Sequence, residues 1–231
     1  MNILALETAT NICSVAVVNE EKVLGKINLN IDRAHSSKLA SAIKNLMELL
    51  GLSFEDLSAV AVSKGPGSYT GLRIGLSTAK GICYSNDIPL IGVETLHGMA
   101  ANFKQYSDSD NKFVSYPMID ARRMEVYTAA FDANSQRQEN TKALIIEEDT
   151  FTDIAEDITI YLYGDGAEKA ISKINRKNVF HIKGIIPDAT GIGLVAIDKF
   201  KLNQFEDVAY FEPFYLKEYK AGKPKSLLQN G

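Results

Sequence analysis

Short apolar runs alternate with helical periodicities along the first hundred residues, and the same order begins again in the second half of the chain. Runs typical of buried strands lie at residues 2–6, 13–18, 23–31, 59–62 and 89–93, and again at 113–119, 125–131, 143–147, 158–163 and 179–182. Helices are expected over residues 37–50, 71–84, 96–103, 151–157, 167–174 and 189–200. A meander of three strands followed by alternating helices and strands predicts a mixed α/β layer, built twice.

The polar stretch at residues 105–112 contains no apolar period and separates the two halves. We therefore expect one domain over residues 1–104, a second over 112–215, and a mobile tail over 216–231. The helix expected near residues 189–200 is a candidate to pack back on the first domain.

Residues 64–84 carry the most distinctive pattern of the chain. A Gly-Pro-Gly turn follows a strand, and Ser68 and Thr70 are candidate N-caps of the helix after it. Gly71 and Gly75 lie one turn apart in this helix, although a glycine costs a helix roughly 1 kcal/mol relative to alanine. Such a cost is tolerated where another element must come close. The pattern leaves two alternatives open: a helix enclosed within its own domain, or one that packs on its sheet and also on a partner.

The second alternative predicts an apolar partner surface on this helix and on the amphipathic helix before it. The residues assigned to that surface are Leu39, Ile43, Met47, Gly71, Leu72, Gly75, Leu76, Thr78 and Ile82. An exposed apolar patch of this kind is costly in isolation, so the free chain is expected to pair with itself as a homodimer.

Composition narrows the classes of function. The chain has 231 residues, 45% of them hydrophobic, and a net charge of -4. These values suit a globular protein. They indicate no positively charged surface large enough to bind RNA by itself, so contact with RNA would be indirect, through a partner. Cys13 and Cys83 lie in apolar contexts typical of reduced core residues, and no apolar run reaches transmembrane length. We therefore expect a cytoplasmic protein without membrane contact.

Three strand-turn loops are expected to face one another across a cleft between the two halves. Their candidate residues are Glu7, Thr8 and Thr10 in the first loop, Asp120, Arg122 and Arg123 in the second, and Gly164 and Gly166 in the third. Phosphate-binding loops of this kind use glycine, so that main-chain N–H groups reach the ligand. The first loop has no glycine, and the third, GDGA, is the most nucleotide-like. An ordinary tight turn for the third loop, and a solvated hairpin tip for the two arginines, remain open alternatives.

Signals for a metal or a nucleophile are poor. The three histidines, His35, His97 and His181, share no ligand spacing, and neither cysteine has a basic neighbour in sequence that would make it a thiolate. We therefore expect no metal site and no catalytic residue in this chain.

Several strings together resemble the TsaB (YeaZ) family of bacterial accessory subunits in tRNA threonylcarbamoyladenosine synthesis. They are NILALETATNICSVAVVN, RAHSSKL, SKGPGSYTGLRIGLSTAKGI, IGVETLHGMA, IDARRMEVYTAAF and YGDGA, which run from residue 2 to residue 167. The resemblance implies an α/β, two-domain actin-like/Hsp70-like (ASKHA) fold, in which each domain is a mixed sheet flanked by helices.

The same resemblance implies a non-catalytic scaffold subunit for the formation of N6-threonylcarbamoyladenosine at adenosine 37 of tRNA. Such a subunit would form a heterodimer with the catalytic subunit TsaD through the surface defined above. It would work with the ATPase TsaE and meet tRNA only through the complex. No cofactor bound tightly by the free chain is implied, and ATP or ADP would bind only within the complex.

The metal site of TsaD offers a further comparison. TsaD holds its metal with a His-x-x-x-His motif, and our alignment places Thr95 and Met99 at these positions, where neither suits a catalytic divalent metal. The resemblance therefore agrees with the poor metal signal and implies no enzyme activity for the chain alone.

Two other classes of function compete with the scaffold. The alternative is a small nucleotide-binding ATPase or phosphotransferase of the actin-like superfamily. The GDGA loop and the paired domains favour it, and the altered first and second loops oppose it. A peptidase has no metal pair and no nucleophile–base pair in the sequence to support it.

Overall fold

The computed structural model describes residues 1–30, 35–105 and 112–217 of the chain, with side chains in the first helix described from Ser37 onward. Most of the predicted tail at 216–231 therefore lies outside the described residues, as does most of the polar stretch at 105–112.

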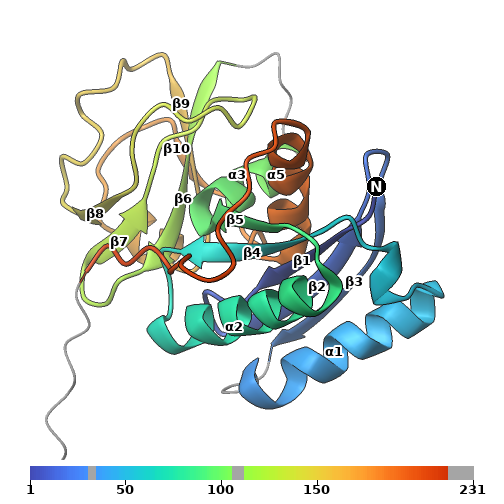
Figure 1. Ribbon diagram of the computed structural model, residues 1–231. Helices are drawn as coiled ribbons and strands as arrows, with labels where there is room; N and C mark the ends of the chain where they lie inside the picture. Colours follow the sequence, from blue (N-terminus) through green and yellow to red (C-terminus); the bar gives the residue numbers. More distant parts are fainter. Residues whose placement is uncertain (31–34, 106–111, 218–231) are drawn as a thin grey trace, which may run out of the picture.

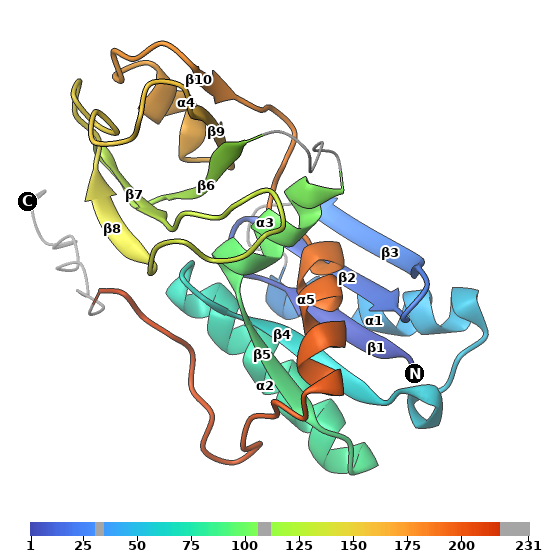
Figure 2. The ribbon, with the colours of Figure 1, turned by 90° about the horizontal axis from the view of Figure 1, so that it is seen from above.

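The chain forms two five-stranded mixed sheets with the same strand order (Figures 1 and 2). The first sheet runs β3-β2-β1-β4-β5, from β1 (Ile3–Glu7), β2 (Ile12–Val18), β3 (Val23–Asn30), β4 (Ala59–Gly65) and β5 (Leu90–Glu94). The second runs β10-β9-β6-β7-β8, from β6 (Phe113–Asp120), β7 (Glu125–Thr128), β8 (Lys142–Ile145), β9 (Thr159–Tyr163) and β10 (Val179–His181). In each sheet the strand that comes first along the chain is central. β1 is antiparallel to β2 and parallel to β4, and β6 is likewise antiparallel to β7 and parallel to β9. The topological repeat predicted from the strand pattern is therefore confirmed.

Helices cover both faces of the first sheet. α1 (His35–Leu50) and α2 (Tyr69–Asn86) lie on one face, and α5 (Ala189–Lys201), from the second half of the chain, lies on the other. α3 (Thr95–Lys104), from the first half, packs against the second sheet, whose other face carries α4 (Ala167–Ile171). The two halves thus exchange helices, and α3 and α5 also contact one another.

Residues 151–157 form turns, so the short helix predicted there is wrong. Phe151 has a positive φ of 72°. The Arg176 guanidinium donates hydrogen bonds to the carbonyl oxygens of Phe151, Ile154 and Ala155. These contacts hold the segment in a series of turns that a helix would not allow at Phe151, since a positive φ lies outside the right-handed helical region.

The apolar stripes of α1 and α2 belong to the chain's own core. Seven of the nine residues assigned to a partner surface are buried there: Leu39, Ile43, Met47, Gly71, Leu72, Gly75 and Leu76. Of that set, only Thr78 and Ile82 are partly exposed. The prediction that these seven residues present an exposed apolar surface is therefore wrong, because the first sheet and the turn after β1 already cover this side of the two helices.

The two glycines of α2 accommodate the turn after β1 rather than a partner helix. A Cβ built on Gly71 would lie 2.1 Å from the Thr8 carbonyl oxygen, and one built on Gly75 would lie 2.2 Å from Thr8 Oγ1. The Thr8 hydroxyl in turn donates a hydrogen bond to the Gly71 carbonyl oxygen at 2.8 Å. The side of α2 that carries Gly71 and Gly75 is therefore enclosed within the chain's own domain.

Gly75→Ala is expected to lower the free energy of unfolding by about 1–3 kcal/mol, because the new methyl group overlaps Thr8. Gly81→Ala is the matched control in the same helix, since nothing lies within 4 Å of the Cβ that it adds. That substitution should stabilise the chain by up to about 1 kcal/mol through helix propensity. Urea unfolding followed by circular dichroism measures both changes. Equal effects of the two substitutions would contradict the close approach of Thr8 to α2.

Candidate functional site

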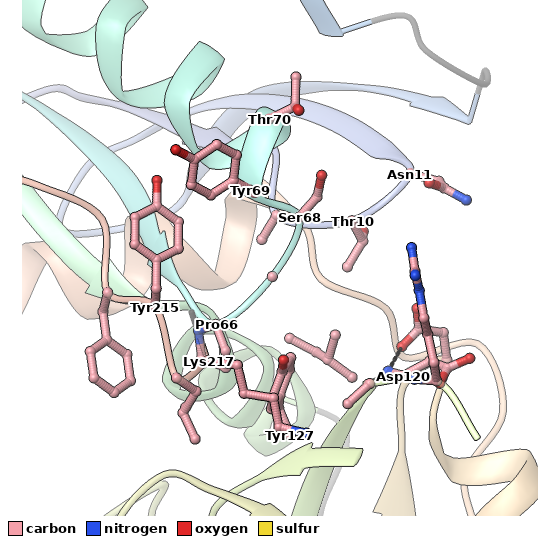
Figure 3. Close-up of a pocket in the computed structure, with 18 residues that line it drawn as sticks. Thr10, Asn11, Pro66, Ser68, Tyr69, Thr70, Asp120, Tyr127, Tyr215 and Lys217 are labelled. Carbon is pink, nitrogen blue, oxygen red and sulfur yellow. Dashed lines mark hydrogen bonds between the residues drawn. The ribbon is translucent and has the colours of Figure 1, made fainter. Parts of the chain in front are cut away.

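A cleft of about 1020 Å³ lies between the two halves of the molecule (Figure 3). The turn after β1 and the residues that lead into α2 form its first wall, and the end of β6 with Tyr127 and Asp165 forms its second. Residues 214–217, which follow α5 in the sequence, form a third wall. The three predicted loops therefore meet at one place, together with a segment near the end of the described chain.

The turn after β1 uses its main-chain donors within the chain. The Thr8 N–H donates to Ser63 Oγ at 3.4 Å, and the Ala9 N–H donates to Glu7 Oε1 at 2.6 Å. The Ala9 carbonyl oxygen accepts a hydrogen bond from the Ser68 N–H at 2.6 Å, which holds the turn against the start of α2. Because a phosphate-binding loop needs such N–H groups free, these contacts disfavour phosphate binding at this turn.

Glu7, the last residue of β1, is fully buried behind the first wall of the cleft. Burial raises the pKa of Glu7 to about 7, and the nearby Asp188 carboxylate contributes in the same direction. Among the described residues, Glu7 Oε2 has no hydrogen-bond partner. Asp188 itself caps α5 and pairs with Lys26 at 3.1 Å. The buried Glu7 carboxyl group thus stays protonated until the pH approaches 7.

Asp120 organises the turn after β6. Its Oδ1 accepts hydrogen bonds from the Arg122 N–H at 2.7 Å and from Lys169 Nζ at 2.5 Å. The Lys169 ammonium also donates to the carbonyl oxygens of Arg123 and Glu125. Burial acts to raise the pKa of Asp120, but the hydrogen bonds from Lys169 and the Arg122 N–H, together with the charges of these two residues, hold this pKa below its ordinary value.

Only one of the two arginines of this turn lies at the cleft. Arg122 and Arg123 have φ values of 68° and 52°, both in the left-handed region. Of the pair, Arg122 lines the cleft and Arg123 does not. The turn therefore offers one guanidinium to a ligand or partner at the cleft, and the other lies outside it.

The GDGA loop packs against β6. The Gly166 N–H donates to the Met118 carbonyl oxygen at 3.1 Å, and Asp165 Oδ1 accepts from the Asp120 N–H at 2.9 Å. Desolvation raises the pKa of Asp165, although the hydrogen bond from the Asp120 N–H acts in the opposite direction. Gly164 has a φ of 99°, a conformation that favours glycine. These contacts, and the five-residue length of α4, support the tight-turn interpretation of this loop.

The structure brings only part of the predicted set to the cleft. The predicted residues that line it are Thr10, Asp120 and Arg122. Those that do not are Glu7, Thr8, Arg123, Gly164 and Gly166.

Sequence reasoning missed the aromatic side of the cleft. Tyr69 and Tyr215 lie beside one another with ring centroids 5.0 Å apart (Figure 3), and Tyr127 faces them from the second half. Lys217 lines the same side and pairs with Glu125 at the start of β7. The only signal in the sequence was the aromatic run near residue 215, whose partners lie far away along the chain.

The positions aligned with a histidine motif are part of the packing around α3. Thr95 is buried, and Met99 belongs to the apolar cluster between α3 and the second sheet. His97 stacks on Phe131 with ring centroids 5.6 Å apart, and burial lowers the pKa of His97. Within residues 1–30, 35–105 and 112–217, no group of three or more His, Cys, Asp and Glu side chains is placed to hold a metal ion. None of the helices in these ranges is long and apolar enough to span a membrane.

Two sheets of identical topology, with a cleft between them and helices exchanged across it, define a two-domain protein of the actin-like fold. A family model described as "TsaD: tRNA N6-adenosine threonylcarbamoyltransferase" matches residues 22–221. The chain belongs to this family, on its TsaB (YeaZ) branch.

Two curated relatives carry the same name, tRNA threonylcarbamoyladenosine biosynthesis protein TsaB. The Bacillus subtilis (strain 168) protein is 35% identical over 131 residues, which cover 57% of this chain and 55% of the relative. The Escherichia coli (strain K12) protein is 36% identical over 143 residues, which cover 61% and 57%. The matched region of the chain thus spans little more than half the length of each of these relatives.

A solved structure extends the likeness of fold over nearly the whole chain. YeaZ from Pseudomonas aeruginosa superimposes with a TM-score of 0.81 at 22% identity, covering 93% of this chain and 99% of that one. The predicted actin-like fold is therefore confirmed.

Glu7→Gln is expected to remove a pH dependence of stability. The folded chain keeps the Glu7 proton up to about pH 7, whereas the unfolded chain releases it near the ordinary pKa of 4.5. The free energy of unfolding should therefore fall as the pH rises through this window, by up to about 3 kcal/mol. Urea unfolding at a series of pH values measures this slope in wild type and in Glu7→Gln, which should lose most of it. Glu55→Gln, at an exposed position, is the control and should keep the slope. An unchanged slope in Glu7→Gln would refute the assignment of a buried, protonated carboxyl group.

Proposed function

We propose that this chain is a non-catalytic accessory subunit for the formation of N6-threonylcarbamoyladenosine in tRNA. Family membership and the names of the curated relatives support the pathway. The observation that supports a non-catalytic role is the state of the first loop, whose Thr8 and Ala9 N–H groups are taken by Ser63 and Glu7. Thr95 and Met99 stand where a metal-binding paralogue carries histidines, and both are buried in packing. The proposed role is therefore to support a catalytic subunit.

We place the partner surface on the outward side of α2 and the adjoining part of α1. Tyr84 and Leu49 are exposed by 85% and 80%. A groove of about 530 Å³ runs beside Tyr84 and is lined by Lys80, Gly81 and residues 207–209. A protruding aromatic ring next to a groove is typical of an interface anchor. Its proposed occupant is a TsaD-type catalytic subunit, which a TsaE-type ATPase joins, and the free chain would pair with itself through the same surface.

Nucleotide and RNA enter this proposal only through the assembly. The cleft of about 1020 Å³ is large enough to favour nucleotide binding as the second candidate function. The main-chain donors of the first and third loops are nevertheless engaged within the chain. We therefore propose no tightly bound cofactor for the free chain, with ATP or ADP bound only in the complex. The net charge of -4 favours indirect contact with tRNA.

Tyr84→Glu should weaken association while leaving the fold intact, because the side chain is exposed and its ring is the proposed anchor. A loss of about tenfold or more in affinity is expected, both for the TsaD-type subunit and for self-pairing. Ile145→Glu is the matched control, since it places the same charge at a 62% exposed position on β8 of the second sheet. Sedimentation of each variant, alone and mixed with the catalytic subunit, measures the effect. Wild-type affinity in a folded Tyr84→Glu chain would show that the surface lies elsewhere.

Arg122→Ala should lower the yield of modified tRNA in a reconstituted reaction by about tenfold, whereas Arg123→Ala should leave it nearly unchanged. A planar guanidinium at the cleft can bind a phosphate or carboxylate with two hydrogen bonds, and only Arg122 of the pair lines the cleft. Both side chains are exposed, so neither substitution should cost much stability. Equal yields for wild type and Arg122→Ala at limiting concentrations of each component would refute a role for this residue.

A further inference from the structure

One segment of the chain lines two separate cavities. Residues 205–217, here called the clasp segment, follow α5 and run past β5 and α2 toward β7 and β8 (Figures 1 and 2). Residues 207–209 form one side of the groove on α2. Residues 214–217 form the third wall of the interdomain cleft. The same segment therefore contributes to the walls of both cavities.

Hydrogen bonds fix most of the clasp segment to the first half of the molecule. The Glu206 N–H donates to the Leu90 carbonyl oxygen at 2.9 Å. Lys80 Nζ donates to the Ala209 carbonyl oxygen at 3.0 Å, which ties the segment to α2 beside the groove. Farther along, the Phe214 N–H donates to the carbonyl oxygen of Lys64, on β4, at 2.6 Å. The segment is thus held to β5, α2 and β4 before it reaches the cleft.

An aromatic clamp holds the segment at the mouth of the cleft. The Tyr215 hydroxyl oxygen accepts a hydrogen bond from Arg73 Nε at 3.1 Å, and the Tyr215 ring lies beside that of Tyr69 (Figure 3). The Arg73 guanidinium carbon lies 4.2 Å from the Tyr69 ring centroid, a cation–π arrangement. Tyr69 and Arg73, one turn apart on α2, therefore hold the clasp segment where it leaves the first half of the molecule.

An ion pair connects the end of the clasp segment to the second half of the molecule. Lys217 pairs with Glu125 at the start of β7, and their side chains are 47% and 21% exposed. Ion pairs exposed to this extent contribute little and are weakened by salt. The covalent connections between the sheets are those from α3 to β6 and from β10 to α5. The clasp segment adds a noncovalent connection between the two halves.

We propose that the clasp segment is a reversible noncovalent connection between the two halves, and that it couples the groove on α2 to the width of the interdomain cleft. With Lys217 on Glu125, the third wall is in place and the two halves are held together at this side. With the pair broken, arrangements in which the halves are farther apart at this side gain population by up to a few-fold, and the cleft in them is accessible to larger ligands. Anything that displaces residues 207–209 from the groove pulls on the same wall. This inference concerns the chain itself and does not depend on the partner proposed above.

Spin labels on opposite halves measure the opening directly. Ser77→Cys on α2 and Glu168→Cys on α4 place labels at exposed positions, and the native Cys13 and Cys83 are buried. Pulsed electron spin resonance on the full chain then gives the distribution of distances between the halves. We expect a narrow distribution in wild type at low salt, and a broader one shifted to longer distances in high salt or with Lys217→Glu.

Three further variants decide the interpretation. Lys217→Glu combined with Glu125→Lys restores the pair with its charges exchanged and should restore the narrow distribution. Arg73→Ala should broaden it, because the grip of α2 on Tyr215 is lost. Lys201→Glu, which breaks an exposed pair with Glu20 at 3.1 Å, is the control and should change nothing. Identical distributions in wild type and Lys217→Glu, or a charge exchange that fails to restore the wild-type distribution, would overturn the proposal.

Discussion

The contact between the turn after β1 and the first turns of α2 constrains most of the molecule. Thr8 fits against Gly71 and Gly75, and the Ala9 carbonyl oxygen accepts the Ser68 N–H. Because β1 is the central strand of the first sheet, this contact fixes α2 on the sheet and places its first residues at the wall of the cleft. The cost of two helix glycines, roughly 1 kcal/mol each, is offset by the burial that their small size permits.

The same contact limits the chemistry of the cleft. In an actin-like architecture the loops at the cleft are well placed to hold phosphates, but here the N–H groups of Thr8 and Ala9 hold the turn in place instead. The turn after β6 is likewise tied down, by Asp120 and Lys169. The chain therefore has the actin-like fold while these main-chain donors serve packing, which illustrates why function has to be argued from the site rather than from the fold. An accessory role fits this division.

Much of the fold could be predicted from the sequence because its signals are local. The apolar runs gave the strands, and the repeated order of elements indicated two sheets of one topology. The helical periods of α1 and α2 were also local, but which of their faces is covered depends on where the sheet and the turn after β1 lie. Gly71 and Gly75 indicated a close approach without identifying Thr8 as the neighbour. At the cleft, Arg73 and Tyr215 are 142 positions apart, so no spacing rule could have paired them.

The most direct test of the account is the transfer of the threonylcarbamoyl group to tRNA, measured with purified components. Three mixtures are compared: this chain alone, a TsaD-type subunit with a TsaE-type ATPase, and all three proteins together, each with tRNA and the activated threonylcarbamoyl donor. The account predicts modified tRNA at full yield only when all three are present, and none from this chain alone. Modified tRNA formed by this chain alone, or at full yield in its absence, would contradict the account.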